Sequence, residues 1–72
     1  MMTRTSEPAG YIRLTLRTSG ELLYLRADAI DAVHAVVDVA QVVYSLIDTG
    51  HDQWAVREPA EEVMMQISKV LA

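Results

Sequence analysis

The chain has no cysteine and no phenylalanine, and only two histidines among its 72 residues. Without cysteine it can form neither a disulfide nor a zinc site with thiolate ligands. His34 and His51 are too few and too isolated to supply a metal site of their own. We therefore expect no metal and no cofactor.

Long apolar runs and an excess of basic residues are also missing. No window approaches the roughly eighteen continuous apolar residues of a transmembrane helix. The N-terminus has no apolar run after Arg4, so no signal peptide is expected. Six basic residues against ten acidic ones give a net charge of −4, which does not favour general attraction to nucleic-acid phosphates. We expect a soluble, cytoplasmic protein.

A chain of 72 residues forms one small domain, of a size that buries only about 60% of its extended surface. Residues 1–10 are polar, with Pro8 and Gly10 near their end, and predict a flexible N-terminal arm. Residues 11–72 are expected to form the domain. Apolar residues make up 51% of the chain, and this excess predicts a face that is covered by self-association.

Two segments near the N-terminus have the alternating pattern of half-buried strands. Within Tyr11–Thr18, one face carries Ile12, Leu14 and Leu16. The other face carries Arg13, Thr15 and Arg17. The pair Ser19-Gly20 predicts a two-residue hairpin turn, in which glycine takes a positive φ. Glu21–Arg26 then returns as the second strand, with its odd-numbered leucines facing the core.

The segment Ala27–Ala40 is ambiguous. Its apolar residues fit a helical stripe, but its valines pack better on a pleated sheet. We prefer one helical turn at Ala27–Asp31 followed by a strand at Ala32–Val37, with a continuous helix as the alternative. Asp38–Gln41 would then be a short turn, although it contains neither glycine nor proline.

The second half of the chain predicts another hairpin. Val42–Ile47 is apolar on both faces apart from Ser45, as expected of a strand that is either central in the sheet or packed against something on its second face. Asp48–Asp52 has the composition of a hairpin loop. Gln53–Arg57 is the last strand, with Trp54 facing inward.

The C-terminal segment Pro59–Leu71 has the pattern of an amphipathic helix. Pro59 suits the first helical position, and the acidic pair Glu61-Glu62 and the basic Lys69 match the two ends of the helix dipole. The apolar stripe consists of Ala60, Val63, Met64, Ile67, Val70 and Leu71. The sequence therefore predicts an α+β fold, a small antiparallel sheet of four to five strands covered by this helix, with a partial barrel as one form of the sheet.

The segment Tyr11–Ile67 resembles the small swarming-motility proteins encoded in flagellar operons. The shared pattern is an Ile-x-Leu-Thr strand, a glycine turn, a second strand, an Ile-x-x-Ile-like step and a Val-x-Glu helix start. The chain departs from it in its longer N-terminal arm, in Pro59 where the family has a serine, and in Arg26-Ala27 where an asparagine is expected. The resemblance implies an interaction protein that acts in motility or its assembly, with no catalytic residues to carry over. The matching positions are Ile12, Leu14, Thr15, Gly20, Ile30, Val33, Gly50, Val56, Glu58, Glu61, Glu62 and Val63.

Four arginines and one tyrosine are expected to share the outer face of the sheet. RNA-binding modules use exposed aromatic and arginine side chains on such a face, but their glycine-aromatic signatures are absent here. An acidic surface of a protein partner would also fit it. A nucleic-acid-binding regulator of phage or plasmid type is therefore the alternative function. The residues of this candidate face are Arg13, Arg17, Tyr24, Arg26 and Arg57.

Other polar groups are better explained as surface or loop residues. Glu61 and Glu62 point about 100° apart on a helix, too far to share a proton. Asp48, His51 and Asp52 offer too few oxygen ligands for a calcium loop. We therefore expect no enzymatic activity.

The fourth strand and its neighbour carry more apolar residues than one helix can cover, and no edge protection is evident. We expect a homodimer through this region, and hence a non-enzymatic protein–protein interaction domain. The candidate residues for self-association are Val36, Val39, Val43, Ser45 and Ile47.

Overall fold

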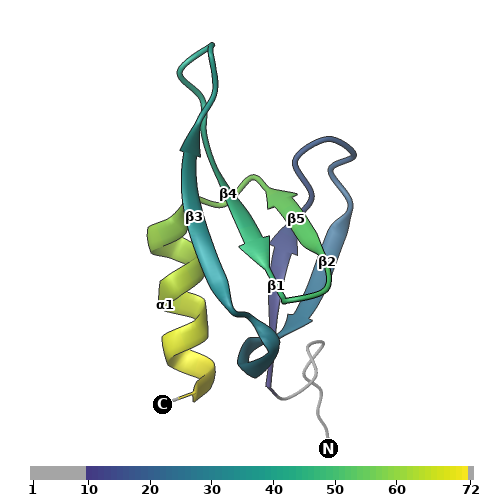
Figure 1. Cartoon of the computed structure of the whole chain (residues 1–72). Helices are drawn as coiled ribbons and strands as arrows, with labels where there is room; N and C mark the ends of the chain where they lie inside the picture. The colour runs from purple at the N-terminus through teal and green to yellow at the C-terminus, as the bar shows by residue number, and fades with distance from the viewer. Residues whose placement is uncertain (1–9, 72) are drawn as a thin grey trace, which may run out of the picture.

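The computed structural model describes residues 10–71, so the predicted N-terminal arm lies almost entirely outside the described residues. Five strands are followed by one C-terminal helix (Figure 1). A short 3₁₀ helix, η1, separates the second strand from the third. In chain order the elements are β1 (Tyr11–Thr15), β2 (Leu22–Arg26), η1 (Ala27–Ala29), β3 (Ala32–Val37), β4 (Val43–Asp48), β5 (Gln53–Val56) and α1 (Ala60–Leu71).

The strands form two antiparallel sheets, β1–β2 and β3–β4–β5, which confirms the α+β fold. The sheets meet where the end of β1 runs beside β5, through an antiparallel bridge between Leu16 and Val56. The Arg17 N–H donates to the Ala55 carbonyl at 2.8 Å, and the Arg57 N–H donates to the carbonyl of Thr15, also at 2.8 Å. The five strands are thus two linked sheets rather than the single sheet expected, and the partial barrel stays a prediction.

The turn between β1 and β2 differs from the expected two-residue turn. Leu16 N–H donates to the Glu21 carbonyl at 2.8 Å, and Gly20 N–H donates to the Leu16 carbonyl at 3.0 Å. The loop therefore comprises residues 17–20, and β1 ends at Thr15. A two-residue turn of type I′ needs positive φ at both positions, whereas here Gly20 alone has it, at 78°.

The segment after β2 confirms the turn followed by a strand, and a continuous helix is wrong. The helical turn is the short η1, whose Ala27 is buried and donates its N–H to the Gly10 carbonyl at 2.9 Å. Strand β3 covers the residues expected. The β-branched valines favour the extended form because it leaves their rotamers unhindered.

The turn between β3 and β4 has neither glycine nor proline and is built by Asp38 instead. Asp38 N–H donates to the Val42 carbonyl at 3.1 Å, and Gln41 N–H donates to the Asp38 carbonyl at 2.9 Å. The Asp38 carboxylate also accepts from the N–H groups of Ala40 and Val42, at 2.8 and 3.0 Å. Gln41 takes the left-handed position, with a φ of 65°, which is unusual for a residue other than glycine or asparagine.

The core lies between helix α1 and the inner faces of both sheets. Val63 is the helix residue that is fully buried, and Ile67 and Val70 pack beside it. Met64 and Leu71, expected on the same stripe, are 51% and 58% exposed, because the stripe that meets β1, β3 and η1 is narrower than the sequence suggested. The fully buried apolar residues of the core are Ile12, Leu14, Ala27, Ile47, Val56 and Val63.

Glu58 fastens the start of the helix to β1. Its two carboxylate oxygens accept from the N–H and the hydroxyl of Thr15, both at 2.9 Å. Its carbonyl accepts from the hydroxyl of Ser45 at 2.7 Å. Further along β1, the side chain of Gln66 accepts from the Arg13 N–H at 3.4 Å. Two backbone N–H groups on the edge of β1, those of Arg13 and Thr15, therefore donate to side chains of α1 and of the residue that precedes Pro59.

The outer part of the β3–β4 hairpin extends beyond the rest of the domain (Figure 1). We call residues 35–44 the projecting hairpin. Its turn lies far from helix α1, which covers only the opposite end of β3. Within it Asp38 is the single charged residue.

Candidate functional site

The register of the first hairpin brings three of the five predicted face residues together. Arg13 lies directly opposite Tyr24, and Arg26 lies opposite Tyr11 on the same face. All three predicted residues are exposed, Tyr24 by 40%. Arg26 is paired with Asp28, with 2.9 Å between guanidinium nitrogen and carboxylate oxygen. The strand prediction is confirmed here, and Arg26 already has a neighbouring counter-ion.

Arg17 and Arg57 lie instead at the loop end of β1, beside the projecting hairpin. The Arg17 guanidinium forms a salt bridge with Asp38 and lies 4.1 Å from the ring centroid of Tyr44. Because β1 ends at Thr15, Arg17 belongs to the loop, and its side chain reaches across to β4. The prediction of one continuous arginine face is wrong in this respect.

Arg57 is positioned by the backbone of the same loop. Its Nε donates to the Arg17 carbonyl at 3.4 Å. Its guanidinium also lies against Gly20, where a Cβ atom would stand 3.2 Å from Nη2. Gly20 therefore serves two purposes, since it supplies the positive φ and leaves room for the arginine.

Asp38 joins the turn to Arg17. The pKa of its carboxyl lies below the ordinary value, first because the Val42 N–H donates to it. The Ala40 N–H and the positive charge of Arg17 lower the pKa further, whereas partial burial raises it. The ionised form is thus favoured, and the salt bridge connects the turn of the projecting hairpin to the loop between β1 and β2.

These groups border a pocket of about 510 Å³ at the base of the projecting hairpin. Its wall combines two guanidinium groups, one aromatic ring and aliphatic side chains. The lining residues are Arg17, Thr18, Val42, Val43, Tyr44 and Arg57. Sequence reasoning selected both arginines but missed Tyr44 and Asp38. The signal for Tyr44 was the alternation of side chains along its strand. The signal for Asp38 was an acidic residue in a turn that lacks glycine.

The predicted self-association residues divide between the core and the projecting hairpin. Ser45 and Ile47 are fully buried, so their assignment to an exposed surface is wrong. Ile47 belongs to the core cluster, and Ser45 is accommodated there because its hydroxyl is bonded to the Glu58 carbonyl. Val43 and Val39 are 50% and 103% exposed.

Exposed valines cluster on the projecting hairpin beyond those selected from the sequence. Val37 lies opposite Val43 and is 55% exposed, while Val36 is half-buried on the other face. Val42, at the end of the turn, is 51% exposed. The inner face of the sheet therefore continues past the helix as an apolar surface.

The remaining polar candidates are solvent-exposed or engaged in loop structure. Glu61, Glu62, His34 and His51 are exposed. The loop after β4 is closed by its own hydrogen bonds, including one from Gly50 N–H to the Asp48 carboxylate at 2.8 Å. Across residues 10–71, no three His, Asp or Glu side chains are grouped closely enough to hold a metal ion.

No family model matches the chain, and neither a curated protein nor a solved structure does. Within residues 10–71, no helix has the length and apolar composition required to cross a membrane.

Proposed function

We propose that this protein is a non-enzymatic protein–protein interaction domain that self-associates through the projecting hairpin. The observation that carries the proposal is the apolar surface at its outer end, where Val37, Val39 and Val43 are at least half exposed. Val37 and Val43 are cross-strand neighbours, and exposed apolar side chains that lie next to one another are typical of interaction sites.

A second copy of the chain suits this surface for two reasons. The projecting hairpin carries one acidic residue, and Arg17 neutralises it, so two hairpins can meet without the repulsion expected from a net charge of −4. A twofold dimer also places the same patch on both sides of the contact, so that valines meet valines.

The polar side chains that could otherwise take part in chemistry serve the fold. The hydroxyls of Thr15 and Ser45 both donate to Glu58, and the carboxylate of Asp38 holds a turn and a salt bridge. These engagements support an interaction domain rather than an enzyme.

The process in which the domain acts is proposed from the resemblance to swarming-motility proteins. On that basis it serves flagellar motility or its assembly, in the cytoplasm. Deletion of the gene from its source organism should reduce swarming, and unchanged swarming would remove this part of the proposal.

The alternative, a nucleic-acid-binding regulator, is favoured by the pairing of Arg13 with Tyr24 on an exposed face. Gel shifts with mixed DNA and RNA at low and high salt test it. Binding that weakens steeply with salt would support this alternative, whereas no shift at low salt would exclude it.

Self-association is tested by sedimentation equilibrium over a range of protein concentrations. We expect the wild type to dimerise and Val37→Asp to remain monomeric. Leu22→Asp is the matched control, because Leu22 is 56% exposed on the other hairpin and Val37 is 55% exposed. A wild type that is monomeric throughout, or two variants that behave alike, would contradict the proposal.

A further inference from the structure

We propose that the pocket at the base of the projecting hairpin binds a carboxylate of a protein partner, one that is flanked by aliphatic side chains. Arg57 is the residue that would hold the carboxylate. This inference goes beyond self-association, because Tyr44 and Val42 lie on the opposite face of the hairpin from Val37, by the alternation of side chains along paired strands.

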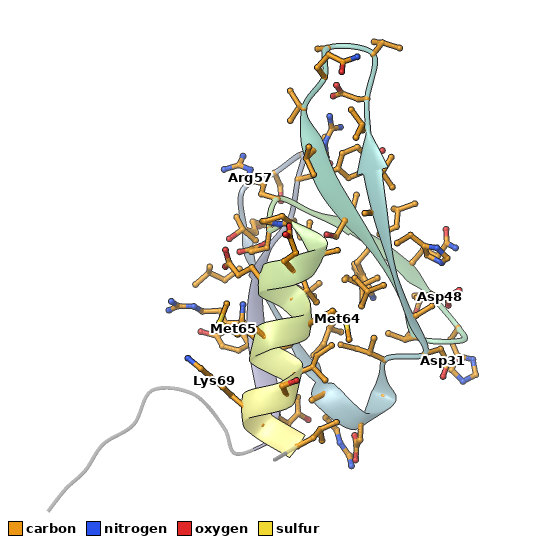
Figure 2. The ribbon with its side chains drawn as sticks, turned by 90° about the vertical axis from the view of Figure 1, so that its left-hand side faces the viewer. Asp31, Asp48, Arg57, Met64, Met65 and Lys69 are labelled. Atoms are coloured by element: carbon orange, nitrogen blue, oxygen red, sulfur yellow. The ribbon has the colours of Figure 1, made fainter. Side chains whose placement is uncertain are left out.

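The two arginines of the pocket differ in whether a carboxylate is paired with their guanidinium group. Arg17 is occupied by Asp38 and by the ring of Tyr44. Arg57 is exposed, and in the described part of the chain no carboxylate lies within salt-bridge distance of it. Figure 2 shows Arg57 beside the base of the projecting hairpin, with Asp31 and Asp48 at the far end of the domain. The pocket therefore holds one more positive charge than negative, on a chain whose net charge is −4.

The Arg57 guanidinium is also held in place before any ligand arrives. Its Nε donates to the Arg17 carbonyl at 3.4 Å, and its guanidinium lies against Gly20. The two Nη groups are the donors that remain for a ligand. A planar fork with fixed orientation matches the two oxygens of a carboxylate, and fixing it in advance lowers the entropic cost of binding.

The groups around Arg57 favour a ligand with a single carboxylate over one with several phosphate groups. The Asp38 carboxylate already compensates the charge of Arg17, so Arg57 supplies a single uncompensated positive charge, which matches a single carboxylate. The aliphatic side chain of Val42 in the pocket wall gains from contact with apolar side chains next to the bound group. Both features are met by a glutamate or aspartate between leucines or valines in an extended segment.

The probe is a short peptide of alternating leucine and glutamate, blocked at both ends, and its matched control has glutamine in place of glutamate. Binding is followed by NMR from the backbone amide signals of the residues that line the pocket, which the wild type and the variants share, at roughly 20 mM salt so that screening is weak. We expect saturable binding of the glutamate peptide and none of the glutamine peptide. Arg57→Gln should weaken binding at least about tenfold, as expected for the loss of a charge-assisted hydrogen bond.

Arg26→Gln is the control variant, because Arg26 is also exposed but is paired with Asp28 on the other hairpin. It should bind the glutamate peptide as the wild type does. The proposal is overturned by equal binding of both peptides, by unchanged affinity in Arg57→Gln, or by tighter binding of a short oligonucleotide at the same site. The titration is repeated on Val37→Asp, so that a failure of self-association and a failure of this pocket are seen separately.

Discussion

Replacing Glu58 by alanine removes the acceptor of two hydrogen bonds that fasten the start of helix α1 to strand β1. Both bonds come from Thr15, one from the backbone N–H and one from the hydroxyl, at 2.9 Å each. A hydrogen bond to a charged group contributes about 1.5–3 kcal/mol, and a backbone N–H left without a partner adds a cost of its own. Thr15 is half-buried, so water can replace part of what is lost.

We therefore expect Glu58→Ala to lower the free energy of unfolding by about 3 kcal/mol. For a domain of this size, each kcal/mol corresponds to roughly 4–8 °C in the melting temperature, so the melting temperature should fall by roughly 12–24 °C. Glu58→Gln retains one good acceptor and should cost about 1 kcal/mol. The measurements are urea and thermal unfolding followed by circular dichroism.

Glu62→Ala is the matched control, since Glu62 is an exposed glutamate in the first turn of the same helix. Its loss should cost no more than about 1 kcal/mol, through the helix dipole alone. A double-mutant cycle with Thr15→Val isolates the hydroxyl bond. If the free energies of unfolding of Glu58→Ala and Glu62→Ala agree within about 0.5 kcal/mol, the hydrogen bonds from Thr15 to Glu58 do not stabilise the fold as their distances indicate.

Three further predictions test other parts of the structure. Gln41→Gly should raise the free energy of unfolding by about 1 kcal/mol, because it relieves the left-handed conformation of Gln41; a lower denaturation midpoint would contradict this. Val63→Ala should cost about 2 kcal/mol, since Val63 is fully buried, whereas Met65→Ala, at a residue 54% exposed, should stay within about 0.5 kcal/mol of the wild type. The lowered pKa of Asp38 stabilises the fold above the ordinary carboxyl value of about 3.9, and this contribution is lost as the pH falls through the lower folded value. The difference in the free energy of unfolding between the wild type and Asp38→Asn should therefore shrink as the pH falls from about 4 through the lower folded value, and a constant difference between them would refute the assignment.

Much of the fold follows from the periodicity of side chains. The alternation in residues 11–16 and 22–26 places each leucine correctly inside or outside, because a strand buried on one face allows one register only. Ala32–Val37 was assigned as a strand because its valines outweigh its alanines. The helix was predicted to within one residue of its observed start.

The candidate site was less accessible from the sequence, for physical reasons. From the sequence, Ser45 and Ile47 belong to a strand with more apolar residues than one helix can cover. Only the structure shows that their face of the strand is part of the core. Arg17 continues the alternation of β1 in the sequence, but the strand ends at Thr15, and no local pattern indicates that Asp38 is its partner. Such contacts depend on how far the hairpins extend past each other, which is decided by packing between distant segments.

The bonds between Thr15 and Glu58 have a consequence for synthesis of the chain. The two residues are 43 positions apart, and helix α1 is the last element of the domain. While the chain is still emerging from the ribosome, strand β1 lacks both the carboxylate and the helix that complete its open edge. The nascent chain therefore cannot close its core until helix α1 has left the exit tunnel, and until then it exposes a strand that chaperones can recognise.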